Sequence, residues 1–430
     1  MLIEFTFANF KSFRDENTLD MTATRISEHP LHVVEIGGDK LLSIAAIYGA
    51  NASGKSNVFQ AFDFMMKYVT RSFEFGGDSD KKNNGKILRM QSEPYLFDEA
   101  SRTKPTTFEV LFIDNGDPRE KTYQYGFSLL GTEVVEEWLY VKAKTSRKQY
   151  RTIFYRKKGE ELQADGLTEK NVELIKLALE KEVLIVSLGS KLKIAKLKAV
   201  RDWFLKNEIL DFGDPKENLF RASRIPDHFV QDRAVQKDVI RFFASFDPSI
   251  QDFKVEEVPA ADGSEDKEYK IETLHKVHGQ DTLVAIPLRN ESSGTLKMFA
   301  LYPSLKNVLE NGGLLFVDEL NARLHPLLLR NLILTFGNPE LNPRHAQLIF
   351  TTHDVWQFSN EILRRDEIWI VDKDDQEVTS LYSVAEFKDE DGNKARKNEG
   401  LAKHYLYGEY GGIPTLSPLS MLKEGDEDGK

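Results

Sequence analysis

The sequence predicts an α/β fold with a parallel-sheet core, an antiparallel β region and a mainly helical insertion. A short apolar run at residues 41–47 precedes a glycine loop and then a stretch at residues 58–66 without Gly or Pro, which is the order strand, loop, helix. Two more apolar runs, at residues 314–317 and 347–351, have the length and composition of buried parallel strands. The pattern between these two parts of the core is different, so we expect the middle of the chain to be inserted into the core.

Each expected element follows from a local pattern. Residues 2–7 alternate apolar and polar side chains, which is typical of a half-buried strand, and residues 9–14 are expected to form a loop. Short β-rich runs separated by turn residues predict an antiparallel meander over residues 106–155. Its strands are expected at 106–113, 122–129, 134–143 and 150–155, the helices at 171–184, 192–205, 235–246, 296–305 and 326–335, and two further strands at 269–274 and 368–371.

These patterns divide the chain into four parts. Residues 1–155 form a first lobe with the glycine loop and the meander, and residues 156–285 form the mainly helical insertion. Residues 286–375 form a second lobe that returns to the α/β pattern, and residues 376–430 form a polar C-terminal extension.

Composition excludes several classes of protein. The 430 residues contain no cysteine, which excludes disulfides and cysteine zinc sites and fits a reducing cytoplasm. The net charge of −11 argues against non-specific coating of nucleic acid, although a local basic groove remains open. No apolar run is long enough to span a membrane, and the N-terminus lacks the features of a signal peptide, so we expect a cytoplasmic protein without a membrane partner.

The glycine loop carries the clearest chemical motif. Gly49, Gly54, Lys55 and Ser56 fit the pattern G-x-x-x-x-G-K-[ST], and the loop lies between a predicted strand and a predicted helix, as this motif requires. Its backbone N–H groups would face phosphate oxygens, Lys55 would hold the β- and γ-phosphates of ATP, and the Ser56 hydroxyl would bind Mg²⁺. The alternative is a plain glycine turn. The expected ATP-binding residues of the loop are Gly49, Ala50, Asn51, Ala52, Ser53, Gly54, Lys55, Ser56 and Asn57.

Two carboxylates follow the predicted strand at residues 314–317. A buried strand that ends at Asp318 would place this carboxylate beside Mg²⁺, and Glu319 would then face the γ-phosphate as a general base for water. The alternative is an edge strand with a solvated acidic end. His353 follows the next apolar strand, where an imidazole can hydrogen-bond a γ-phosphate; the alternative is a structural histidine.

A second helix start has the composition of an anion site. Small residues and a glycine open the helix predicted at residues 296–305, in the segment Glu291, Ser292, Ser293, Gly294 and Thr295. One ATP cannot contact both helix starts in one subunit if they lie on opposite sides of the fold. A second copy packed head to tail would bring this segment onto the phosphate, whereas the alternative is a plain helix N-cap.

Together these motifs resemble the ABC-type ATPase heads of the SMC, RecF and OLD group. They look most like the stand-alone AAA-type ATP-binding proteins of bacterial anti-phage and abortive-infection systems, the RloA and AbiL kind. The resemblance covers most of the chain. It is carried by residues 9–13, the glycine loop, residues 291–295, 317–320, 324–326 and 351–354, and the aromatic and glycine-rich stretch at 405–414.

The resemblance implies an ATP-sandwich dimer, with Ser293 and Gly294 acting on the nucleotide of the other subunit and His353 as the switch histidine. It implies that Lys11 and Ser12 also contact ATP. Gln91 is a candidate third Mg²⁺ ligand, although a surface glutamine is an equal alternative. Two features depart from the family pattern: Asn321 stands where related proteins often carry an acid, and a Toprim nuclease domain of the OLD type is missing. The cluster Asp372-Lys373-Asp374-Asp375 is expected to be a turn.

Three functions remain open from the sequence. The leading hypothesis is an ATPase that dimerises around ATP and regulates a separate effector in anti-phage defence; family analogy implies that this effector is a nuclease. The second is a RecF-like DNA repair clamp, and the third is a nucleotide-gated scaffold that holds a toxin. A basic stretch could contact DNA or RNA, or could be the solvated face of an amphipathic helix; it contains Lys191, Lys193, Lys196, Lys198 and Arg201.

Overall fold

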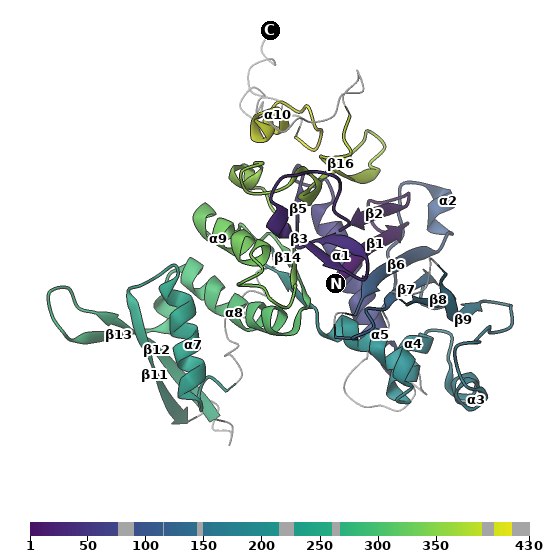
Figure 1. Cartoon of the computed structure of the whole chain (residues 1–430), viewed down its shortest axis with the longest axis horizontal. Coiled ribbons are helices and arrows are strands. Elements are labelled where there is room, and N and C mark those ends of the chain that lie inside the picture. Colours follow the sequence, from purple (N-terminus) through teal and green to yellow (C-terminus); the bar gives the residue numbers. More distant parts are fainter. Residues whose placement is uncertain are drawn as a thin grey trace, which may run out of the picture.

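The protein is built around two six-stranded sheets, with a smaller three-stranded sheet projecting on one side (Figure 1). The computed structural model describes residues 1–75, 90–114, 116–143, 149–214, 228–259, 267–388 and 400–414. No helix in this part of the chain has both the length and the apolar character needed to cross a bilayer.

The central sheet has the strand order β10-β14-β15-β5-β16-β17. Its first five strands are parallel, and β17 pairs antiparallel with β16 at one edge. Every residue of β5, β14 and β15 is buried, because helices cover both faces of these strands. The strands are β5 (Ile44–Tyr48), β10 (Glu208–Asp211), β14 (Leu314–Asp318), β15 (Gln347–Thr351), β16 (Ile368–Lys373) and β17 (Thr379–Ser383).

Helices from distant parts of the sequence cover the two faces of this sheet. Helix α1 (Lys55–Arg71) packs on one face, where Phe59 contacts Phe316 of β14. Helices α8 (Ser293–Asn311) and α9 (Pro326–Gly337) pack on the other face. The expected helices at 296–305 and 326–335 are confirmed, and α8 is longer than predicted at both ends.

The second large sheet is antiparallel and lies on the far side of α1. Its order is β2-β1-β6-β7-β8-β9, and Phe62 of α1 packs edge to face on Phe5 of β1. The predicted meander is confirmed, since β6 to β9 are neighbours in chain order. The strands are β1 (Leu2–Ala8), β2 (Asn17–Asp20), β6 (Thr106–Ile113), β7 (Thr122–Leu130), β8 (Glu133–Lys142) and β9 (Arg151–Lys157).

Two smaller elements join these sheets. The hairpin of β3 (Val33–Ile36) and β4 (Asp39–Leu42) precedes β5, and the short helix α2 (Glu99–Arg102) precedes β6. The 3-10 turns are η1 (Pro30–His32), η2 (Ser72–Glu74), η3 (Leu288–Asn290), η4 (Val355–Gln357) and η5 (Arg365–Glu367).

The first helices of the insertion pack beside α1. They are α3 (Glu169–Ala178), α4 (Ile185–Lys191) and α5 (Ala195–Leu205). The helix expected at 171–184 ends at Ala178. The Glu137 carboxylate of β8 accepts the N–H groups of Ile185 and Val186 and so caps a separate helix, α4. Lys193 and Ile194 then separate α4 from α5, the first with a positive φ and the second with extended backbone.

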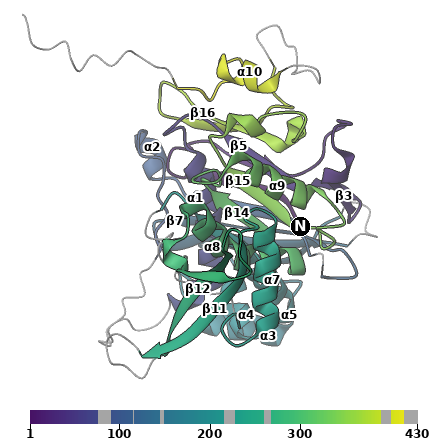
Figure 2. The same ribbon diagram turned by 90° about the vertical axis from the view of Figure 1, so that its left-hand side faces the viewer.

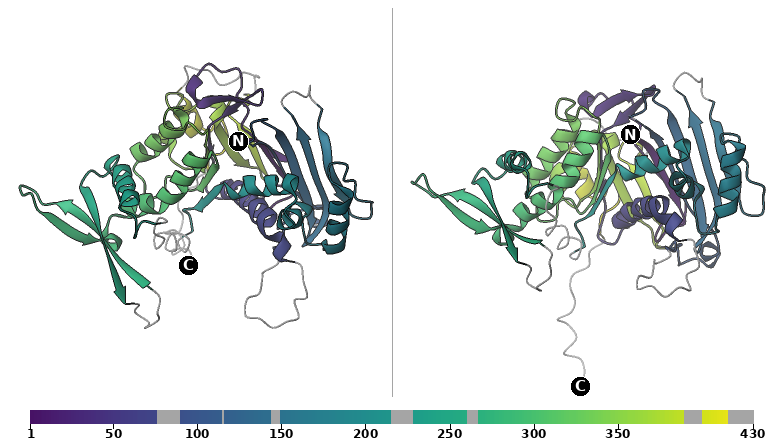
Figure 3. Two further views of the ribbon diagram at one scale, coloured as in Figure 1. Left: turned by 60° about the horizontal axis from the view of Figure 1, so that its bottom comes forward. Right: turned by 90° about the horizontal axis from the view of Figure 1, so that it is seen from below.

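The insertion also contains strands that the sequence patterns did not indicate. Strand β10 joins the central sheet, and β11 (Ile250–Pro259) pairs with β12 (Lys267–Lys276), which extends beyond the expected strand at 269–274. Strand β13 (Leu283–Pro287) completes a three-stranded sheet that α7 (Arg233–Ala244) covers through Phe243. This projecting sheet and the large antiparallel sheet lie at opposite ends of the molecule (Figure 3).

The predicted fold class is confirmed: an α/β core with a glycine loop, an antiparallel β subdomain and a helical insertion. The bounds of the four parts of the chain stay predictions, and part of the C-terminal extension lies outside the described residues. Its described part includes α10 (Leu401–Leu406), which lies above β16 (Figure 2). The expected turn at residues 372–375 is only partly correct, because Asp372 and Lys373 belong to β16 and pair with β17; the turn begins at Asp374, whose carboxylate accepts the N–H groups of Gln376 and Val378.

Candidate functional site

The glycine loop connects β5 to α1 at the carboxyl edge of the central sheet. Gly54 has a φ of 111°, and a Cβ there would lie 2.8 Å from Ser12 Oγ and 3.0 Å from Thr379. Only glycine allows both this backbone conformation and this close approach. Within the described residues, the backbone N–H groups of Gly54, Lys55 and Ser56 donate to no protein acceptor. These donors and the start of a 17-residue helix form a cradle for an anion.

Lys55 is buried inside this loop. Its Nζ donates to the carbonyl oxygens of Gly49, at 3.0 Å, and Ala50, at 2.8 Å. Burial lowers the pKa of Lys55 to about 8, and the nearby carboxylates of Glu319 and Asp318 oppose this shift. The Ser53 hydroxyl is also buried, and it has no hydrogen-bond partner among the described residues. A buried cation, free N–H donors and an orphaned hydroxyl fit a bound phosphate chain.

Lys11 and Ser12 come from the loop after β1, and the structure places them differently. The Ser12 hydroxyl accepts a hydrogen bond from Asn57 at 2.7 Å, and the Ser12 carbonyl accepts from the N–H of Thr379 at 2.9 Å. Ser12 therefore packs directly against the glycine loop. Lys11 instead donates to Gln60 on α1 at 2.7 Å, away from the loop carbonyls that hold Lys55.

Asp318 lies at the end of β14 and is buried. It accepts a hydrogen bond from the Thr351 hydroxyl, and burial raises its pKa, a shift that the nearby hydroxyls of Thr351 and Ser56 oppose. Asp318 and Ser56 thus meet beside the first turn of α1. A carboxylate and a hydroxyl are oxygen ligands that suit Mg²⁺.

Glu319 turns away from the strand with a φ of 55°, in the left-handed region that is costly for a residue with a Cβ. Its N–H donates to Thr351 Oγ1 at 2.8 Å, which fixes this conformation. The Glu319 carboxylate lies 3.4 Å from His353 Nε2, and this hydrogen bond is the main reason why the pKa of Glu319 is lowered. Glu319 is therefore ionised at neutral pH and half-exposed beside His353.

The loop after Glu319 is held by a residue that the sequence patterns did not indicate. Lys297 of α8 donates to the carbonyl oxygens of Glu319 at 3.3 Å, Leu320 at 2.9 Å and Ala322 at 2.5 Å. Its Nζ also lies 4.0 Å from the centre of the Phe212 ring. Burial lowers the pKa of Lys297 to about 7. A single lysine among apolar helix residues (Leu296, Met298, Phe299) was the signal available in the sequence.

Asn321 is part of the same loop. Its side-chain oxygen accepts the N–H of His353 at 3.3 Å. Asn321 thus joins the loop after β14 to the histidine after β15, a contact that an aspartate at this position could also make.

The predicted signature segment opens α8 on the opposite face of the sheet from α1. Ser292 caps the helix by accepting the N–H of Thr295 at 3.1 Å, and Gly294 packs near the carbonyl of Arg323. Glu291 faces the projecting sheet, where His275 Nε2 lies 2.8 Å from Glu291 Oε1 and Thr273 donates to the same oxygen. No hydrogen bond among the described residues joins residues 291–295 to the glycine loop of the same chain.

Other residues that the sequence singled out lie apart from this cluster. Gln91 is exposed, and in the part of the chain that the structure describes no hydrogen bond joins it to Ser56 or Asp318. His325 caps α9 by accepting the N–H of Leu327 at 3.2 Å, with Pro326 at the first helical position, so its role is structural. In the basic stretch, Lys191 lies 5.0 Å from the ring centre of Phe73 and Arg201 donates to the carbonyl of Thr70, so these two cations contribute to packing.

Comparison with known proteins gives one family. Residues 44–355 match the family described as "AAA domain, putative AbiEii toxin, Type IV TA system". The match begins at β5 and ends just after His353, so it contains the glycine loop, the signature segment and the Asp318-Glu319 pair. No curated protein matches the chain.

Two solved structures are similar at low identity. An SMC head bound to the C-terminal winged-helix domain of ScpA is 13% identical, with a TM-score of 0.42, and the alignment covers 89% of this chain and 97% of that one. An SMC head domain from Thermotoga maritima is 15% identical, with a TM-score of 0.40 and coverage of 89% and 98%. The family match extends over well more than half of the sequence, and the chain therefore belongs to this family of AAA domains.

Proposed function

We propose that the protein binds ATP with Mg²⁺ at the glycine loop and hydrolyses it, with Glu319 as the general base. The observation that carries the proposal is the convergence of five side chains at one edge of the central sheet: Lys55, Ser56, Asp318, Glu319 and His353. Lys55 and the N–H groups of the loop hold the phosphates. Glu319 takes a proton from the attacking water, and His353 orients the Glu319 carboxylate.

Ser56 and Asp318 are the proposed ligands of Mg²⁺, which neutralises phosphate charge when it is bound. Their buried contact supports this assignment. Gln91 stays a prediction as a third ligand.

Two substitutions test this assignment. Lys55→Ala removes the buried cation and should weaken binding of a fluorescent ATP analogue by about a hundredfold. Glu319→Gln keeps the shape of the side chain, so the variant should bind ATP normally while phosphate release falls roughly a hundredfold or more. Full hydrolysis by Glu319→Gln would remove Glu319 from the catalytic role.

We further propose that a second copy of the chain completes the site, with Ser293 and Gly294 of one subunit facing the ATP of the other. The position of the signature segment on the opposite face from α1 supports this arrangement. The test mixes two variants, Lys55→Ala and Ser293→Arg, each inactive alone. A site shared between subunits restores roughly a quarter of the turnover, because half of the random dimers are mixed and each has one complete site. A mixture as inactive as its components would contradict the shared site.

As the biological role of this ATPase, we propose control of a separate effector, a nuclease, in anti-phage defence. The family description names an AbiEii toxin and a type IV TA system, which supports a role of this kind. The test uses the product of the adjacent gene. Its nuclease activity on plasmid DNA should differ between addition of wild-type protein and of the Glu319→Gln variant, which holds ATP. Equal activity in both mixtures would contradict control by the nucleotide state.

A further inference from the structure

The aromatic and glycine-rich stretch near the C-terminus lies directly on the start of the glycine loop. Tyr405 of α10 stacks on Phe358 with ring centres 4.6 Å apart, and Phe358 also packs on Tyr48, the last residue of β5. Figure 1 shows α10 next to β16, which is the neighbour of β5 in the central sheet. Residues from the far end of the described chain therefore cover the strand that leads into the phosphate cradle.

The Tyr405 hydroxyl holds the backbone segment that covers the loop. It donates to the carbonyl of Gly412 at 3.0 Å, in a buried position. The N–H of Gly49, the first glycine of the loop, is close enough to oppose the rise in the pKa of Tyr405 that burial causes. Removal of this one oxygen would leave the buried Gly412 carbonyl without its donor beside Gly49.

Two consecutive glycines allow the C-terminal segment to approach this closely. Gly411 and Gly412 have φ values of 71° and 64°. A Cβ on Gly412 would lie 2.7 Å from Ile370 and 3.5 Å from the Cα of Gly49, and a Cβ on Gly411 would lie 2.6 Å from the Tyr382 hydroxyl. The backbone must therefore pass between β16, β17 and the glycine loop without side chains.

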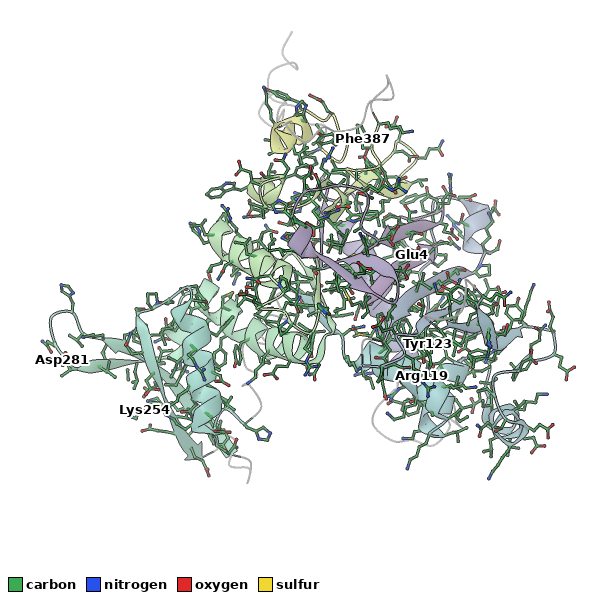
Figure 4. The ribbon with its side chains drawn as sticks, viewed as in Figure 1. Glu4, Arg119, Tyr123, Lys254, Asp281 and Phe387 are labelled. Atoms are coloured by element: carbon green, nitrogen blue, oxygen red, sulfur yellow. The ribbon has the colours of Figure 1, made fainter. Side chains whose placement is uncertain are left out.

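Aromatic contacts hold the rest of the segment in place. Tyr382 of β17 donates to the carbonyl of Tyr410 at 2.8 Å, and Phe387 packs edge to face on Tyr410 with ring centres 5.4 Å apart. Phe387 is labelled beside α10 in Figure 4. The segment is thus fixed to the core independently of Tyr405, so its position need not collapse when a single hydroxyl is lost.

We propose that Tyr405 is a positioning residue of the nucleotide site, which fixes the start of the glycine loop and couples ATP binding to the segment at residues 400–414. The inference rests on the proposed binding of ATP. Coupling between two sites is reciprocal. The segment should therefore stabilise the ATP-bound loop, and bound ATP should stabilise the segment.

The first test compares two tyrosines of the same segment in the Glu319→Gln background, which prevents turnover. Tyr405→Phe removes only the hydroxyl and keeps the stack on Phe358. Tyr407→Phe is the matched control, because the Tyr407 side chain is 70% exposed. We expect the dissociation constant of MgATP to rise about fivefold for Tyr405→Phe and to change less than about twofold for Tyr407→Phe. The melting temperature does not decide the question, because a purely structural hydrogen bond would also lower it.

The second test needs no substitution at Tyr405. Amide hydrogen exchange in residues 401–413 of the Glu319→Gln variant should slow when MgATP is added. If the segment exchanges at the same rate with and without ATP, or if folded Tyr405→Phe binds ATP as tightly as its parent, the proposal is overturned while the proposed ATP site stands. If the Glu319→Gln parent with Tyr405 intact binds no ATP, both proposals fail together.

Discussion

The two halves of the candidate site are held in place in different ways. The glycine loop is fixed by close contacts on its own backbone: the side chains of Ser12 and Thr379 lie against Gly54, and the backbone of Gly412 lies against Gly49. The signature segment at the start of α8 is held by polar side chains, through His275 with Glu291 and Lys297 with the loop after Glu319, whereas the rest of α8 packs through buried apolar side chains. Close backbone packing resists displacement, whereas single hydrogen bonds between side chains can exchange partners. We infer that the loop half is the rigid part and the signature half is the adjustable part.

The strongest test of the rigid half is Gly54→Ala. The added Cβ would meet Ser12 and Thr379 at 3.0 Å or less, and a φ of 111° is strained for alanine. We expect ATP affinity to fall by about a hundredfold and the free energy of unfolding to fall by roughly 1–3 kcal/mol. Isothermal calorimetry and chemical unfolding measure the two effects.

The matched control is Gly279→Ala in the projecting sheet. Gly279 also has a positive φ, of 75°, but a Cβ there has nothing within 4 Å. Its substitution should cost only about 1 kcal/mol of stability and leave ATP affinity unchanged. Normal ATP binding by Gly54→Ala would show that the loop is not held by these close contacts.

A substitution in the adjustable half should change the turnover of ATP rather than the affinity for ATP. Lys297→Met keeps the apolar stem but leaves the carbonyls of Glu319, Leu320 and Ala322 without their donor. The loss of this anchor should displace Glu319 and lower kcat about tenfold or more, with the dissociation constant of ATP within about twofold of wild type. Steady-state phosphate release separates the effect on kcat from the effect on ATP affinity.

The control for Lys297→Met is Lys306→Met, on the same helix, where the lysine is a third exposed and pairs with Asp238 at 3.2 Å. It should have normal turnover. Equal losses in both variants would indicate a general effect on α8 rather than an effect on the catalytic loop.

Lys297 also predicts a pH dependence of stability. Its pKa falls from 10.5 to about 7 in the fold, so between pH 7 and 10 the unfolded chain binds a proton that the folded chain has released. The contribution of this group to the free energy of unfolding therefore rises with pH in this window, by up to about 1.4 kcal/mol per unit. Chemical unfolding at several pH values gives the free energy of unfolding of wild type and of Lys297→Met. The difference between the two isolates the contribution of this group. A difference that is flat from pH 7 to 10 would contradict the buried position of the ammonium.

The sequence predicted the parts of the site that follow strands and missed the parts that depend on contacts between distant segments. Buried parallel strands are continuous apolar runs, so β5, β14 and β15 and the polar residues at their ends could be located. Strand β10 has only two apolar residues between Glu208 and Asp211, and no local pattern separates it from a loop.

The missed residues of the site have no local signature. Thr351 joins Asp318 to the N–H of Glu319, and Tyr405 holds Gly412 against Gly49, but both roles arise only when the chain is folded. The charged pattern of β11 and β12 was similarly hard to interpret, because the two strands pair with each other and leave one face to solvent. Charged side chains on that projecting sheet, such as Lys254 and Asp281, are labelled in Figure 4.

The smallest predicted effect concerns the link between the projecting sheet and the signature segment. His275→Gln removes the contact with Glu291, but Thr273 still donates to the same carboxylate. A partly exposed hydrogen bond with a remaining partner contributes little, so turnover should fall only about threefold. ATP affinity of the isolated subunit should not change, because the contact belongs to the half that lies on the opposite face from the glycine loop.

His278→Gln, at an exposed position in the turn before β13, is the control and should behave as wild type. A threefold change in ATP affinity of His275→Gln would show that the two halves are not separate, because a substitution in the projecting sheet would then have altered the rigid loop.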